Sequence, residues 1–84
     1  MDYKFLDKVV DQIVRETRID YNEKKIYYPF SFYPLPLLTS IYPPSLYSSF
    51  FEHCKNVYGL NDDEVKYVWD EYIKIIRDKI ENGL

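Results

Sequence analysis

The sequence predicts a mainly α protein of the α+β class that forms one small domain over residues 1–84. Apolar side chains recur every three or four residues near the N-terminus and again in the C-terminal half, which is the period of an amphipathic helix. Strand-forming residues and all five prolines lie between these two regions. The expected order is an N-terminal helix, a short β-hairpin, a proline-rich and aromatic extended strap, and a C-terminal antiparallel two-helix hairpin. A chain of 84 residues has room for one hydrophobic core.

The first predicted helix covers residues 2–16. Its apolar positions follow a three- and four-residue spacing along one face, and they are Leu6, Val9, Val10, Ile13 and Val14. Mostly charged and amide side chains occupy the other positions, so the helix is amphipathic. Asp2 precedes the first turn, and its carboxylate can accept a hydrogen bond from a free backbone N–H, so we expect it to be the N-cap.

A short β-hairpin is predicted for residues 17–28. Residues 17–21 alternate weakly, residues 22–24 are polar and typical of a turn, and residues 25–28 are rich in strand formers. Because a two-stranded ribbon is only marginally stable alone, we expect one of its faces to pack on the helices. The alternative is that this segment forms an irregular loop.

The strap, residues 29–44, contains all the prolines, which are Pro29, Pro34, Pro36, Pro43 and Pro44. Proline lacks a backbone donor and restricts φ, so a regular helix or a central strand is disfavoured through the strap. The positions between the prolines are mostly aromatic or aliphatic, which is too apolar for a free linker. We therefore expect the strap to cross the core as an ordered extended segment.

A second helix is predicted to begin at Pro44, which suits a first turn, and to end at residue 58. Its apolar face is broad and consists of Leu46, Tyr47, Phe50, Phe51, Cys54, Val57 and Tyr58. Gly59 follows directly and can adopt the left-handed conformation that ends many helices. Leu60 supplies the apolar residue that accompanies a Schellman ending.

Asn61 and Glu64 have the spacing of a capping box, which predicts the start of a third helix. Leu60 and Val65 flank the box and are expected to pack on each other as a hydrophobic staple. The apolar stripe of this helix is predicted to contain Val65, Val68, Trp69, Tyr72, Ile76 and Ile80. We expect Trp69 to be buried in the middle of this stripe and Tyr67 to lie on the far side.

The chain offers few residues for catalysis or metal binding. His53 is the only histidine and Cys54 the only cysteine, and neighbouring residues on a helix point about 100° apart, so the two cannot form a nucleophile and base pair by themselves. One histidine and one cysteine also fall short of the ligands of a zinc site. We expect His53 to be a hydrogen-bonded structural side chain and Cys54 a small buried hydrophobe. The protein is expected to have no enzymatic activity, cofactor or metal.

Nucleic-acid binding is the alternative function, and the charges argue against it. The net charge is −3, and from Asn61 onwards there are seven acidic and four basic residues. In a helix-turn-helix protein the second helix presents its N-terminal residues to the bases, but here Asp62, Asp63 and Glu64 would meet the phosphates. Surfaces that bind single strands also place their aromatic rings in a positive groove, and the aromatic segment of this chain has no positive charge.

The composition predicts a cytoplasmic protein that does not enter a membrane. No stretch approaches the roughly 20 apolar residues that cross a bilayer, and the polar N-terminus lacks the apolar region of a signal peptide. A lone cysteine allows no intramolecular disulfide. The absence of alanine and the abundance of tyrosine, isoleucine and lysine are typical of AT-rich genomes. Small proteins of viruses and phages often share this bias, and so do proteins of parasites and of low-GC bacteria.

Residues 26–51 contain no charged side chain and nine aromatic ones, which is the most unusual feature of the sequence. A core of three short helices cannot enclose all these rings, and tyrosine combines a rigid apolar ring with a polar tip, as interface residues do. We therefore expect a small non-enzymatic protein, an accessory, adaptor or inhibitor, that binds another protein or forms a homo-oligomer. The expected partner-binding residues are Tyr27, Tyr28, Phe30, Phe32, Tyr33 and Tyr42. The alternative is that the strap fills the core and its tyrosine hydroxyls reach solvent.

Overall fold

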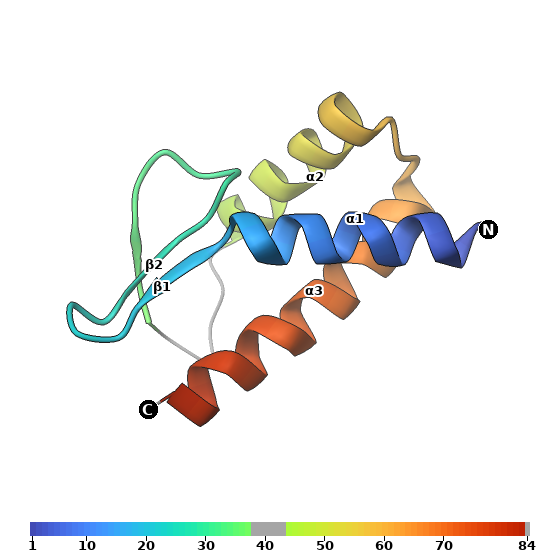
Figure 1. Cartoon of the computed structure of the whole chain (residues 1–84). Coiled ribbons are helices and arrows are strands. Elements are labelled where there is room, and N and C mark those ends of the chain that lie inside the picture. The colour runs from blue at the N-terminus through green and yellow to red at the C-terminus, as the bar shows by residue number, and fades with distance from the viewer. Residues whose placement is uncertain (38–43, 84) are drawn as a thin grey trace.

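The computed structural model describes residues 1–37 and 44–83, and within them it contains three helices and a small antiparallel sheet. The helices are α1 (Tyr3–Glu16), α2 (Pro44–Tyr58) and α3 (Asp62–Gly83), and the strands are β1 (Arg18–Asp20), β2 (Lys25–Tyr27) and β3 (Leu35–Pro36). This arrangement, drawn in Figure 1, confirms the predicted mainly α fold and the predicted order of its elements. None of the helices in these residues is long and apolar enough to span a bilayer.

The ends of α1 follow the local signals of the sequence. Asp2 is the N-cap, and its carboxylate accepts a hydrogen bond of 3.2 Å from the backbone N–H of Phe5. At the other end Thr17 is extended, and its hydroxyl donates to the carbonyl oxygen of Ile13 at 2.7 Å. The chain therefore leaves the helix directly into β1. The buried residues of α1 are Leu6, Val9, Val10 and Ile13, as the periodicity predicts.

The predicted hairpin is present, and a third strand extends it. β1 and β2 are antiparallel with Ile19 opposite Ile26, and the turn between them has Lys24 at a positive φ of 57°. The strap then returns as β3, which pairs with β2 so that Leu35 lies opposite Ile26. The sequence did not predict this pairing. Pro36 is tolerated there because β3 is an edge strand, where a missing N–H interrupts no ladder.

α2 buries a narrower face than its sequence suggests. Only Leu46, Phe50 and Cys54 are buried among its residues, whereas Val57, which was expected on the apolar face, is 59% exposed. The helix ends at Gly59, whose φ of +66° confirms the predicted left-handed conformation. Its hydrogen bonds differ in detail from a Schellman ending, because the N–H of Gly59 reaches the carbonyl oxygen of Lys55 at 3.2 Å and the N–H of Leu60 reaches that of Cys54 at 3.4 Å.

The predicted capping box opens α3. The N–H of Glu64 donates to the side-chain oxygen of Asn61, and the N–H of Asn61 donates to the carboxylate of Glu64, both at 2.9 Å. Leu60 and Val65, the expected staple, are both buried. Two otherwise free donors at the start of the helix are thus satisfied within the same turn.

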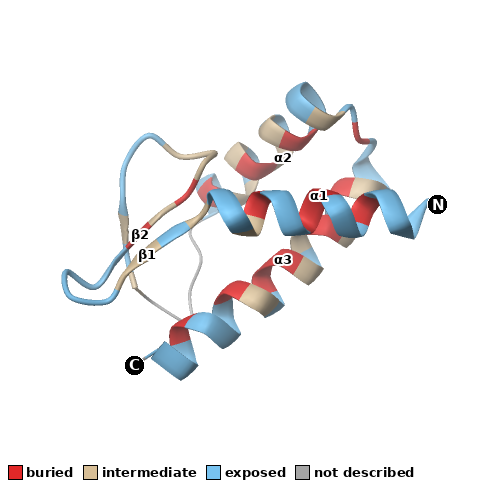
Figure 2. Ribbon diagram, in the orientation of Figure 1, coloured by how far each residue is buried: buried red, intermediate tan, exposed pale blue. Residues whose placement is uncertain are grey.

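α2 and α3 diverge from their joint in a V, and α1 crosses α3, on which it packs most extensively (Figure 1). Figure 2 shows the buried residues of the three helices facing the space between them. β2 contributes Ile26 to this core, Tyr28 just after β2 contributes its ring, and the joint contributes Leu60. The helical core residues are Leu6, Val9, Val10, Ile13, Leu46, Phe50, Cys54, Val65, Val68, Tyr72, Ile73, Ile76 and Ile80.

Two predictions about α3 are wrong. Trp69 is only partly buried, and Tyr72 is instead the large aromatic residue that is completely enclosed. Tyr67 does not lie on a free outer face, since its ring centroid is 5.0 Å from that of Tyr3 and its hydroxyl donates to Asp7 at 2.8 Å. Tyr67 is in contact because α3 packs on both α1 and α2, so the contact surface of α3 is wider than one helical stripe.

Candidate functional site

The described part of the strap, residues 29–37, leaves β2 and returns to it as β3 through a tight loop. The backbone N–H of Ser31 donates to the carbonyl oxygen of Tyr28 at 3.3 Å, and the Ser31 hydroxyl donates to the carbonyl oxygen of Tyr33 at 3.1 Å. These two bonds close a tight loop formed by residues 28–33. The loop separates the aromatic side chains of the strap into an inner and an outer set.

The inner set packs into the core. Tyr28 is 6% exposed, and its ring centroid lies 5.1 Å from that of Phe30. The Phe30 ring in turn makes edge contacts with Phe50 of α2 at 5.1 Å and with Tyr72 of α3 at 5.9 Å. Phe30 therefore joins the strap to both α2 and α3.

The outer set projects into solvent. Phe32 is 101% exposed and Tyr33 is 77% exposed, although both are large aromatic residues. Tyr27, in β2, is intermediate, because the guanidinium of Arg18 lies 4.0 Å from its ring centroid. Tyr42 lies outside the described residues. Of the residues expected to bind a partner, the structure thus places Phe32 and Tyr33 on the surface and Tyr28 and Phe30 against the core.

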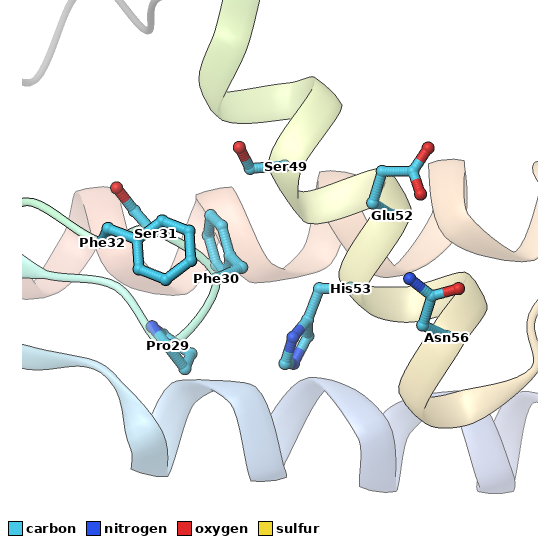
Figure 3. A pocket seen from close by; sticks show the side chains of 8 residues that line it. All are labelled: Pro29, Phe30, Ser31, Phe32, Ser49, Glu52, His53 and Asn56. Atoms are coloured by element: carbon cyan, nitrogen blue, oxygen red, sulfur yellow. The ribbon is translucent and has the colours of Figure 1, made fainter.

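A pocket of about 440 Å³ opens between the strap and α2. The strap contributes one side of it and α2 the other, and its lining consists of Pro29, Phe30, Ser31, Phe32, Ser49, Glu52, His53 and Asn56 (Figure 3). The volume lies within the range of 300–1,000 Å³ that is common for ligand pockets. The exposed ring of Phe32 and the core ring of Phe30 therefore both contact the same hollow.

The α2 side of the pocket is a polar stripe that sequence reasoning missed. Ser49, Glu52, His53 and Asn56 are separated by three, one and three residues, a spacing that places them on one face of a helix. The prediction for this helix concerned its apolar face, and its polar residues were not considered as a group. Their helical spacing next to the aromatic strap was the signal that could have identified this side of the pocket.

The electrostatics of the pocket are set by a single carboxylate. Among the described residues that line it, Glu52 is the only acidic residue, and none is lysine or arginine. Ser49 and Asn56 add oxygen atoms that can accept hydrogen bonds. The pocket therefore combines aromatic walls on the strap side with hydrogen-bond acceptors and one negative charge on the α2 side.

A second, smaller pocket adjoins the first. It has a volume of about 180 Å³ and is lined by Ser31, Tyr33, Leu35, Ser45, Leu46 and Ser49. Ser31 and Ser49 line both pockets, so the two hollows adjoin each other where the strap faces α2. Phe32 thus lines the larger pocket and Tyr33 the smaller one.

His53 and Cys54 occupy different environments. His53 lies at the edge of the core, as expected, but its Nε2 is buried and has no hydrogen-bond partner among the described residues, which corrects the expectation of a hydrogen-bonded histidine. Cys54 is fully buried, as expected, and burial raises the pKa of its thiol from 9.0 to about 12. The reactive thiolate is therefore scarce at neutral pH.

Within residues 1–37 and 44–83, no group of three or more histidine, cysteine, aspartate or glutamate residues is placed to hold a metal ion. The strap, the pocket and the polar stripe of α2 are therefore the features on which a function can be argued. Comparison of the chain with models of protein families, with characterised proteins and with solved structures finds no match.

Proposed function

We propose that this protein is a small non-enzymatic binding protein that contacts another protein, or a second copy of itself. The contact surface is the tip of the strap, which we define as Phe32 and Tyr33, together with the adjoining pocket. The observation that carries the proposal is the exposure of Phe32 and Tyr33, two consecutive large aromatic residues of the strap. Large aromatic residues are the commonest anchors of protein interfaces. Because both rings are exposed, neither one contributes much to the stability of the folded protein.

The charge distribution supports the same surface. The chain has a net charge of −3, yet residues 26–51 are uncharged. The buried centre of an interface is depleted of charged residues, because removing a charge from water is costly unless it is paired. A partner that covers the strap has no strap charge to desolvate. The tip is therefore better suited to a protein contact than the charged outer faces of the helices.

The proposal extends to class and setting. We propose an accessory, adaptor or inhibitor role in the cytoplasm, and the compositional bias toward AT-rich codons supports a viral or phage source. The burial of Cys54 supports a non-enzymatic role, since it withholds the one thiol of the chain from substrates.

The test is a double substitution at the tip, Phe32→Ala with Tyr33→Ala. Because both rings are exposed, the circular dichroism spectrum and the thermal midpoint should match the wild type. Binding to proteins captured from the source cells, or self-association measured by sedimentation, should weaken by more than about 1 kcal/mol, which is the threshold for an interface anchor.

A matched control is Phe5→Ala, which removes an exposed phenylalanine of α1, away from the strap. This variant should bind as the wild type does. If the double variant keeps the partners and the self-association of the wild type, the tip is not the contact surface and the proposal is wrong.

A further inference from the structure

We propose that the pocket between the strap and α2 binds an arginine side chain presented by the partner protein. This inference rests on the proposed function and adds the chemistry of the partner. It follows from three features of the described lining: aromatic rings on one side, hydrogen-bond acceptors on the other, and one carboxylate without a cation.

The strap side offers flat apolar surfaces. Pro29, Phe30 and Phe32 lie on this side of the pocket, and Figure 3 labels all three among its lining residues. A guanidinium group is planar and weakly hydrated, so it stacks on aromatic faces more readily than a lysine ammonium does. The aliphatic stem of an arginine can cover the same rings.

The α2 side offers acceptors at successive turns of the helix. The Ser49 hydroxyl, the Glu52 carboxylate and the side-chain oxygen of Asn56 can each accept a hydrogen bond. Arginine carries five N–H donors and no acceptor, and its fork can pair with a carboxylate through two bonds. An anionic ligand would be repelled by Glu52, and a purely apolar one would leave the stripe without partners.

The protein itself holds a cation in the same way on another face of α2. The Nζ atom of Lys55 lies 4.5 Å from the ring centroid of Phe51 and forms an ion pair with Asp62. One ring and one carboxylate together thus hold one internal cation. The pocket has both kinds of group, in Phe32 and Glu52, but its described lining has no cation. The net charge of −3 favours the approach of a basic segment.

The test uses a short probe, the peptide acetyl-Gly-Arg-Gly-amide, and a peptide in which citrulline replaces arginine. Citrulline has nearly the same shape but no charge. With ¹⁵N-labelled protein, the arginine peptide should cause saturable amide shifts confined to residues 29–33 and 49–56. The citrulline peptide should bind about tenfold more weakly, because charge-assisted hydrogen bonds are the stronger ones.

Variants then locate the charge. Glu52→Gln and Phe32→Ala should each weaken the arginine peptide by about fivefold or more, through loss of the carboxylate and of the stacking surface. Both side chains are exposed, so the remaining amide spectrum should stay that of the folded protein. The control is Glu81→Gln, which removes an equal charge from the exposed last turn of α3 and should leave the affinity unchanged.

The inference is overturned if the amide shifts are absent or lie outside these residues. It is also overturned if the citrulline peptide binds the wild-type protein as tightly as the arginine peptide does, or if Glu52→Gln binds the arginine peptide as tightly as the wild-type protein does. Measuring how the variants bind the captured partner protein distinguishes failure of the arginine proposal from failure of the proposed function. If Phe32→Ala loses the partner while Glu52→Gln keeps it, the tip is an interface without an arginine site. If Glu52→Gln and the double variant at Phe32 and Tyr33 both keep the partner, both proposals are wrong.

Discussion

The joint between α2 and α3 and the strap differ in what determines their structure. At the joint, backbone groups find partners a few residues away: the N–H of Gly59 reaches Lys55, and Asn61 and Glu64 satisfy each other. In the strap, the decisive contacts of Phe30 are with Phe50 and Tyr72, which come from two other elements of the fold. Local hydrogen bonds determine the first region, whereas in the second the placement of the side chains depends on ring packing between distant segments.

The difference shows which kinds of information a sequence displays. Caps and left-handed glycines occur at fixed offsets, so their roles follow from spacing alone. Phe30 and Phe32 are the same residue type two positions apart in one uncharged segment, and no local rule distinguishes them. Only the path of the folded strap places one ring in the core and the other in solvent.

The largest expected effect separates these two rings. Phe30→Ala should lower the free energy of unfolding by about 3 kcal/mol, the lower end of the range for a phenylalanine in a core, because Phe30 is partly buried and joins the strap to two helices. Phe32→Ala should change it by less than about 0.5 kcal/mol, because that ring is fully exposed. Urea denaturation followed by circular dichroism measures both. Equal losses for the two variants would contradict the placement of the strap.

A smaller effect is expected at the end of α2. Gly59→Ala should destabilise the protein by about 1 kcal/mol, since alanine is strained at a φ of +66°. A methyl group there would meet no atom within 4 Å, so the cost is one of backbone conformation and not of crowding. Gly59→Asn serves as the control, because asparagine tolerates the left-handed region and should cost less. Identical thermal midpoints for the alanine variant and the wild type would count against the cap.

The capping box should contribute to the free energy of unfolding by an amount similar to that of Gly59 or slightly smaller. Asn61→Ala removes the acceptor for the N–H of Glu64 and should cost about 0.5–1 kcal/mol. Asn61→Asp keeps an acceptor at the same place and should retain the stability of the wild type. Thermal denaturation of the two variants side by side measures the difference, and a loss shared by both would mean that the cap is not its cause.

The last effect concerns a polar contact between distant helices. The hydrogen bond to Asp7 is the main cause that raises the pKa of Tyr67 from 10.0 to about 12. Because the folded value lies above the unfolded one, the stabilisation is complete below pH 10 and is lost as the pH rises through about 12. An ultraviolet titration should show a late tyrosine transition that Tyr67→Phe removes.

Asp7→Ala removes both the hydrogen-bond acceptor and the charge, so it should move the Tyr67 transition back toward the ordinary pKa, whereas Asp7→Asn keeps an acceptor and should move it less. Tyr58 needs separate assignment, because burial and then the nearby charge of Glu16 also raise its pKa. If the late transition persists unchanged in Tyr67→Phe, the contact between α1 and α3 does not control that proton.

The sequence predicted the strap side of the candidate site but not its α2 side. The uncharged aromatic segment predicted the two exposed rings, Phe32 and Tyr33, but the same criterion also selected Tyr28 and Phe30, which pack against the core. Composition reports how many rings a segment holds and not which way each one points. Glu52 and Asn56 were missed because their importance depends on the strap lying across α2, a contact between separate elements.

The sequence by itself determined the three helices, the Asp2 cap, the turn at Gly59, the capping box and the hairpin, because each depends on groups a few residues apart. The tertiary structure decided the pairing of β3, the partial exposure of Trp69, the contact of Tyr67 with α1, and the pocket. Each of these joins segments that are distant in the chain. Their geometry depends on how all the side chains fill one shared core, and spacing along a single element does not contain that information.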